Sequence, residues 1–165
     1  MRLPNRKLGK YTFTQFDPKI TKAKLQILQK KLAQAKAALP QAIKETQQYG
    51  ENGDFSENAE YQIAKGRLRA LNRAIEELQY QINHAEMIAA PAGNTTVQIG
   101  HTVTIRNNNR EQTFQILGSS ETNPKAGIIS YQSPLGSVLL GHLIGDTVKL
   151  KMANTAQEYI IVAII

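Results

Sequence analysis

The chain has 165 residues, 41% of them hydrophobic, and contains no cysteine, which excludes disulfide bonds and cysteine-based metal sites. The length suits one large domain or two small ones. No run approaches the ~18 apolar residues of a membrane span, and residues 1–20 lack the apolar core of a signal peptide. We therefore expect a cytoplasmic protein with no membrane partner, and a monomer is the simplest arrangement.

The net charge of +7 is concentrated in the N-terminal part of the chain. Residues 1–44 carry eleven basic residues and a single acid, Asp17. Such a segment suits nucleic acid, RNA or DNA, or an acidic protein surface. A solvated helix face explains the same composition equally well.

Residues 1–19 are polar and basic without a sustained period, which predicts an extended N-terminal arm. A helix should begin near residues 18–21, with Asp17 or Thr21 as its N-cap, and end near Tyr49. Pro40 lies inside this helix and should bend it, because proline removes one backbone hydrogen bond. Apolar or small residues recur along it in steps of three and four, at Leu25, Leu28, Leu32, Ala35, Leu39 and Ala42.

A second helix is predicted from between Asp54 and Ser56 to about Ile88, after a glycine-containing turn at residues 50–53. At ~1.5 Å per residue it would be ~45–50 Å long, so its distal half should project into solvent or into a partner. The two patterned segments predict an antiparallel coiled-coil hairpin over residues 20–90 with an acidic tip at 53–61. The second stripe comprises Tyr61, Ala64, Leu68, Leu71, Ile75, Leu78, Ile82 and Ala85.

After a Pro-Ala-Gly-Asn linker at 91–94, the pattern becomes that of a small domain over 95–165. Ser133-Pro134 should open one short helix, as N-cap and first-turn proline, that ends near Leu140. The remainder predicts a mostly antiparallel sheet, so the fold class is α+β. The expected strands are 101–106, 111–117, 127–131, 147–152 and 158–164, with turns around 107–109 and 154–155.

No self-contained catalytic machinery is evident. His84, His101 and His142 lack metal-ligand spacing and are read as ordinary surface or interface residues. There is no G-x-x-x-x-G-K-[ST] loop and no G-x-G-x-x-G after a strand. We therefore do not expect the chain to be an enzyme by itself.

Two acids at the tip permit two interpretations. Asp54 and Glu57 are three residues apart and can point the same way at a helix start. They suit an N-terminal capping box. They also suit a Mg²⁺ site completed by ligands from a partner and a nucleic-acid phosphate, because two carboxylates alone hold the ion weakly.

The stretch Gly53-Asp54-Phe55-Ser56-Glu57-Asn58-Ala59-Glu60-Tyr61, followed by Ala64-Lys65, closely resembles the tip signature of the bacterial Gre transcript-cleavage factors, which are transcription elongation factors. The likeness covers about residues 20–165 and is strongest to GreA-like members. It continues through Pro40, Ile129-Ser130, Ser133-Pro134-Leu135-Gly136, Leu139-Leu140-Gly141 and Gly145-Asp146.

The resemblance implies that the coiled coil enters the secondary channel of RNA polymerase while an FKBP-like C-terminal domain grips the channel rim. The tip acids would help position a Mg²⁺ shared with the polymerase and a water. The polymerase would then cut the 3′ end of backtracked RNA. No cofactor of the chain's own is implied.

The same resemblance implies roles for individual residues. Asp54 and Glu57 would be the metal-assisting acids, and Phe55, Ser56, Asn58 and Glu60 would shape the tip. Lys65, with Arg67, Arg69 and Arg73 nearby, would face RNA. Glu121, Ser133 and Pro134 would lie at the polymerase-binding surface.

Three departures from the family pattern keep alternatives open: Gly50 in place of an arginine, a single acid (Glu121) in residues 119–125, and the high positive charge. They leave room for a non-cleaving paralogue that occupies the channel and inhibits transcription, although both tip acids are retained. A third interpretation is direct binding of structured RNA by the basic face.

The FKBP-like fold also suggests prolyl isomerase activity, which needs a pocket lined by aromatic residues. This activity is disfavoured, because the small domain offers only Phe114, Tyr131 and Tyr159.

Overall fold

The computed structural model describes residues 16–51, 59–91, 93–108, 110–151 and 156–165. Two compact units can be distinguished. One contains residues 26–84, and the other combines residues 17–25 with 85–165. The short segment 17–25, which the sequence suggested as the end of the arm and the start of the first helix, therefore belongs with the C-terminal unit.

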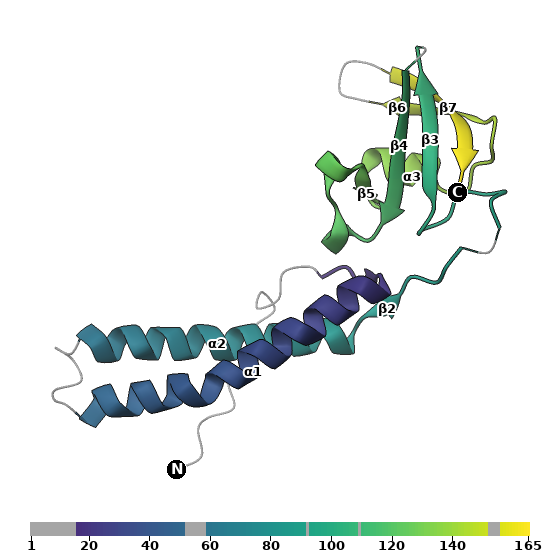
Figure 1. Ribbon diagram of the computed structural model, residues 1–165. Helices are drawn as coiled ribbons and strands as arrows, with labels where there is room; N and C mark the ends of the chain where they lie inside the picture. The colour runs from purple at the N-terminus through teal and green to yellow at the C-terminus, as the bar shows by residue number, and fades with distance from the viewer. Residues whose placement is uncertain (1–15, 52–58, 92, 109, 152–155) are drawn as a thin grey trace. The chain divides into compact units, whose positions relative to one another are not determined.

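Two long helices dominate the first unit. Helix α1 spans Lys22–Glu51 and continues through Pro40, and helix α2 spans Ala59–Asn83. Figure 1 shows them side by side and running in opposite directions. Every residue of the two predicted stripes is buried or half-buried, with the deepest burial at Leu28, Ala42, Ala64 and Ile75. The predicted helical pair is thus confirmed, because its apolar stripes are the faces that are buried.

The prediction for the end of the second helix was wrong. Helix α2 stops at Asn83 and not near Ile88. The backbone N–H groups of Glu86 and Ile88 instead donate to the carbonyls of Pro18 (2.7 Å) and Ile20 (2.9 Å). Strand β1 (Lys19–Ile20) and strand β2 (Glu86–Met87) form a parallel pair by these bonds, which replace those of another helical turn. The predicted start of the helix at 54–56 lies outside the described residues.

The C-terminal unit contains a five-stranded sheet in the order β5-β4-β3-β7-β6. All neighbouring pairs are antiparallel except β4 and β5, and the predicted strands are confirmed to within a few residues at their ends. Asn107 pairs with Arg110, which closes the predicted first hairpin. The strands are β3 (Thr102–Asn107), β4 (Arg110–Leu117), β5 (Ile128–Ser130), β6 (Thr147–Lys151) and β7 (Ala156–Ile164).

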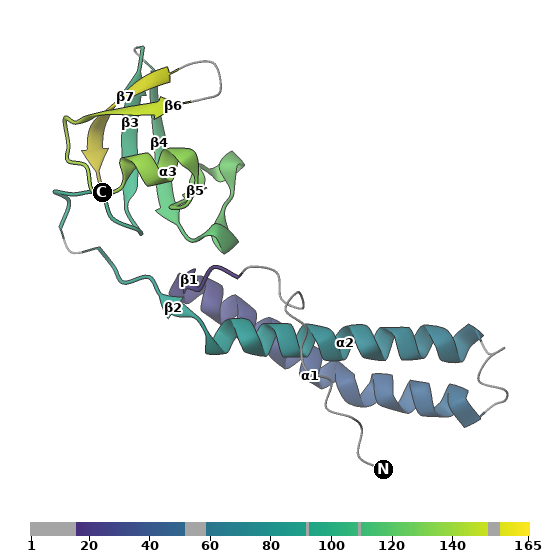
Figure 2. The ribbon, with the colours of Figure 1, turned by 180° about the vertical axis from the view of Figure 1, so that it is seen from behind.

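Helix α3 (Pro134–Leu139) covers one face of this sheet, as Figure 2 shows. Its Leu139 is fully buried with inward-facing residues of the strands, including Val103, Ile105, Ile116 and Ile161. The opposite face is polar, with a Thr104–Thr113 hydroxyl contact and a Lys149–Glu158 ion pair. A single core between one helix and one face of a sheet is typical of a small α+β domain.

The predicted start of α3 is confirmed in detail. Ser133 is extended, its Oγ accepts a hydrogen bond from the backbone N–H of Gly136, and Pro134 occupies the first turn. Two short 3₁₀ helices, η1 (Ser119–Glu121) and η2 (Pro124–Ala126), connect β4 to β5. In the described part of the chain, no helix is long and apolar enough to cross a membrane.

Candidate functional site

In the sequence, the acidic stretch lies between the two long helices. Helix α1 ends at Glu51 and α2 begins at Ala59, with Glu60 exposed in its first turn. An acid at that position interacts favourably with the positive end of the helix dipole. The predicted tip residues Asp54, Phe55, Ser56, Glu57 and Asn58 lie between these ends, outside the described residues.

A shallow cavity lies beside the last turn of α1. It has a volume of about 360 Å³ and is lined by Thr46, Gln47, Gly50, Glu51 and Tyr61. Gly50 has no side chain to fill this space.

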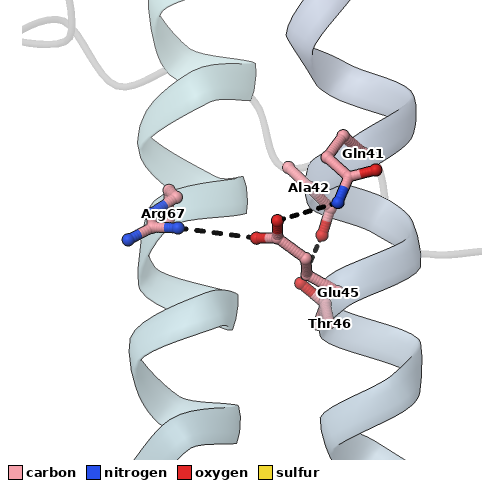
Figure 3. A network of polar contacts seen from close by, with 5 residues as sticks. All are labelled: Gln41, Ala42, Glu45, Thr46 and Arg67. Carbon is pink, nitrogen blue, oxygen red and sulfur yellow. Dashed lines mark hydrogen bonds and ion pairs between the residues drawn. The ribbon is translucent and has the colours of Figure 1, made fainter.

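A small polar network joins the two helices further from the tip (Figure 3). Arg67 of α2 forms an ion pair with Glu45 of α1, with 3.4 Å between Nη1 and Oε2. The other carboxylate oxygen of Glu45 accepts a 3.0 Å hydrogen bond from Gln41, one turn earlier. Arg67 is 68% exposed, so the pair is worth at most about 1 kcal/mol, and it orients the side chain toward α1.

The other three predicted RNA-facing residues lie together. Lys65, Arg69 and Arg73 are spaced by four residues on α2, so they follow one another along one side of the helix at intervals of about 6 Å. Lys65 Nζ lies 5.2 Å from the centre of the Tyr61 ring, an arrangement that favours the cation. The structure therefore groups three of the four cations and separates Arg67 from them.

The described residues contain no group of three or more His, Asp or Glu side chains that could hold a metal ion. The expectation of ordinary surface or interface histidines is wrong for His101, which is buried and whose Nε2 has no hydrogen-bond partner among the residues that the structure describes. His84 contacts the carbonyl of Tyr80, His101 is buried and accepts a hydrogen bond from the Gln98 N–H, and His142 pairs with Asp146. The Asp146 pKa is lowered by the Leu143 N–H and by His142.

The three predicted polymerase-binding residues have different environments. Pro134 is exposed, and Ser133 is half-buried because its hydroxyl both caps α3 and donates to the Ser130 carbonyl at 2.6 Å. Glu121 is half-buried, and both of its carboxylate oxygens bond to Thr21. The predicted aromatic trio of Phe114, Tyr131 and Tyr159 packs against the hydrophobic core.

Sequence reasoning missed a polar cluster around Asp17, whose carboxylate is buried. It accepts hydrogen bonds from the Ser119 N–H at 2.6 Å, the Lys19 N–H at 3.1 Å and the Tyr131 hydroxyl at 3.3 Å. Burial alone would raise the pKa of Asp17, but these hydrogen bonds together hold it below its usual range. The one available signal was an isolated acid in a basic segment.

The chain matches two models of known protein families. Residues 18–87 match the family model "Transcription elongation factor, N-terminal", and residues 92–165 match "Transcription elongation factor, GreA/GreB, C-term". Together the two models span most of the chain.

Individual relatives agree with the family models. The transcription elongation factor GreA of Trichlorobacter lovleyi is 34% identical over 149 residues, covering 88% of this chain and 94% of that protein. The GreA of Rhodospirillum rubrum is 35% identical over 123 residues, covering 73% and 78%. Among solved structures, GreA factor homolog 1 of Thermus thermophilus is 25% identical, with 91% and 99% covered and a TM-score of 0.41.

Proposed function

Because this chain belongs to the GreA/GreB family of transcription elongation factors, we propose that it stimulates RNA cleavage by bacterial RNA polymerase. In this proposal the α1–α2 pair enters the secondary channel of the polymerase. Its tip acts on the extruded 3′ end of backtracked RNA, and the C-terminal unit docks at the channel rim. The factor works in the cytoplasm as a monomer and activates the polymerase in trans.

The observation that carries the proposal is the position of the acids. Asp54 and Glu57 fall in the seven residues between the end of α1 at Glu51 and the start of α2 at Ala59, and these two helices run in opposite directions. Helix α1 with 30 residues and α2 with 25 are about 45 and 37 Å long. A narrow pair of that length suits delivery of two carboxylates into a channel that a globular surface could not enter.

The donor chemistry of the tip fits a shared magnesium site. Carboxylate oxygens are the ligands Mg²⁺ prefers, and the ion usually takes only one or two from any protein. Asp54 and Glu57 would hold it from this chain's side, with the remaining ligands from the polymerase and RNA. When bound, Mg²⁺ supplies activation of water and charge stabilisation for phosphodiester hydrolysis.

The described residues around the tip would orient the substrate. Lys65, Arg69 and Arg73 present three cations at about 6 Å intervals, which suits interaction with successive phosphates of a single strand. Glu60 adds negative charge at the start of α2. In the C-terminal unit, the exposed Pro134 lies beside Ser133, the N-cap residue of α3, and provides a surface for docking at the rim.

The test is the stimulation of cleavage by variants of the tip acids. Asp54→Asn and Glu57→Gln keep the size of each side chain and remove its charge. We expect each to abolish trimming of RNA in a halted, backtracked complex while binding to polymerase, measured by competition with labelled wild type, is unchanged. Parallel loss of binding and cleavage would show instead that the acids fold or dock the tip.

The alternative is a channel plug that inhibits transcription without cleavage. Gly50 favours it, because Gre factors usually carry an arginine just before the tip and glycine has no side chain that could contact RNA. A wild-type protein that binds polymerase, slows elongation and leaves backtracked RNA intact would establish this alternative.

A further inference from the structure

The N-terminus of helix α1 is capped by an acid from a distant part of the chain. Thr21 is the N-cap residue, because its Oγ1 accepts a 3.2 Å hydrogen bond from the backbone N–H of Lys24. In a capping box, an acid three residues after the cap would bond back to the N–H of the cap. Lys24 occupies that position, and the first turn of α1 contains no acid.

Glu121 of η1 supplies the missing carboxylate. Its Oε2 accepts from the Thr21 N–H at 2.7 Å, and its Oε1 accepts from the Thr21 hydroxyl at 2.6 Å. The negative charge also lies at the positive end of the helix dipole. Nearby, the Lys24 ammonium donates to the carbonyl of Ser120 at 3.0 Å. The cap is therefore complete, but it depends on residues one hundred positions away.

The same short 3₁₀ segment holds the residues that precede α1. The Ser119 N–H donates to Asp17 at 2.6 Å. A side chain on Gly118 would place its Cβ 1.9 Å from the carbonyl oxygen of Lys19, so the two backbones approach as closely as glycine permits. Residues 118–121 thus bind residues 17–24 through four consecutive positions.

We propose that Glu121 is a positioning residue that anchors the base of the α1 helix to the C-terminal unit. Helix α1 begins in that unit and continues unbroken into the helical pair, so the cap holds the end of α1 from which the hairpin extends. This inference rests on the proposed function, since the hairpin is what delivers the tip. Anchoring of α1 replaces direct binding to the polymerase as the proposed role of Glu121.

The experiment is a double-mutant cycle on Glu121→Ala and Thr21→Val in the full-length protein. Glu158→Ala is the matched control, because Glu158 is an exposed acid of the same unit that pairs with Lys149. Two quantities are measured for each: the maximal rate of RNA cleavage in backtracked complexes, and the factor concentration giving half that rate. Amide hydrogen exchange over residues 21–25 is followed in the free protein.

We expect Glu121→Ala and Thr21→Val each to speed exchange over residues 21–25 by roughly ten- to hundredfold, as removal of hydrogen bonds to a charged group implies. Both should lower the maximal cleavage rate while half-saturation stays within about twofold, and the double variant should be no worse than either single one. Glu158→Ala should behave as wild type.

Other outcomes would overturn the inference. If Glu121→Ala raises the half-saturating concentration and Thr21→Val does not, Glu121 binds the polymerase directly. Unchanged exchange and cleavage in both variants would show that the cap anchors nothing. A wild-type protein without any stimulation would instead overturn the proposed function, and the exchange data would still decide whether the anchor exists.

Discussion

At the scale of single residues, the C-terminal unit depends on two close interactions with the segment before α1. One is electrostatic: the buried carboxylate of Asp17 accepts three hydrogen bonds, two of them from backbone N–H groups. The other is steric: Gly118 lies against the Lys19 carbonyl. Each can be removed by one substitution.

The hydrogen bonds to Asp17 predict a pH dependence of stability. Since the folded pKa of Asp17 lies below its unfolded value, its contribution is present above about pH 4 and is lost as the pH falls through the folded pKa. Asp17→Asn should lower the free energy of unfolding by about 1–3 kcal/mol at pH 7. Urea unfolding of both proteins at pH 7, 5 and 3 should show the difference shrinking at the lowest pH; a constant difference would contradict the assignment.

Gly118 and Gly66 have different surroundings, which predict opposite effects on stability when each is replaced by alanine. Gly118→Ala forces its Cβ into the Lys19 backbone and should destabilise the protein by about 1–3 kcal/mol. Gly66→Ala is the control, because nothing lies within 4 Å of its Cβ position on the exposed side of α2. It should stabilise by about 0.5–1 kcal/mol through helix propensity. Thermal unfolding would reveal both, and a neutral Gly118→Ala would show that the two backbones can separate freely.

At the scale of elements, local sequence pattern was a good guide. The three-and-four spacing located both buried stripes, and Ser133-Pro134 located the start of α3. These features depend on neighbouring residues, so a local pattern suffices. The end of α2 could not be predicted in this way, because it is decided by hydrogen bonds from residues 86–88 to residues 18–20, about 68 positions earlier.

The candidate site likewise combines features that depend on neighbouring residues with features that depend on distant ones. The acids of the tip were predicted from their spacing and from a family motif, both of which are local, and they remain a prediction because they lie outside the described residues. The cap by Glu121 on Thr21 and the pairing of Arg67 with Glu45 depend on which residues the fold brings together. Helical spacing alone separates Arg67 from Lys65, Arg69 and Arg73, but it does not identify the partner of Arg67 on the other helix.

A pair of isoleucines in α2 tests the stripe directly. Ile75 is buried and Ile63 is 64% exposed. Ile75→Ala should lower the free energy of unfolding by about 2 kcal/mol or more, whereas Ile63→Ala should change it by less than about 0.5 kcal/mol. Urea unfolding followed by circular dichroism measures both. Equal losses would mean that Ile63 is covered in solution.

At the scale of the whole molecule, the proposed function assigns a separate task to each unit. The cations Lys65, Arg69 and Arg73 on α2 would engage RNA, and the C-terminal unit would dock at the polymerase. We therefore expect Arg69 and Arg73 to contribute to engagement of nucleic acid, whereas Arg67 pairs with Glu45 of α1.

Arginine variants distinguish the cations proposed to contact RNA from the one that pairs with α1. Arg69→Gln with Arg73→Gln should weaken stimulation of cleavage and reduce its salt dependence, by about 0.7 in the log–log slope for each phosphate that is no longer neutralised. Arg67→Gln, on the side that pairs with Glu45, should leave that slope unchanged. Cleavage rates at a series of salt concentrations provide the comparison. A reduced slope for Arg67→Gln would place it among the RNA-binding residues after all.

Stimulation of RNA cleavage by this protein can be measured as a single rate. Labelled nascent RNA in a halted, backtracked bacterial elongation complex is followed with Mg²⁺ present, with wild-type protein, with Asp54→Asn or with no factor. We predict rapid 3′ trimming with the wild type alone, and background trimming in the other two reactions. Trimming by the wild type at the background rate, with binding to the polymerase demonstrated in the same sample, would contradict stimulation of cleavage and indicate a channel plug.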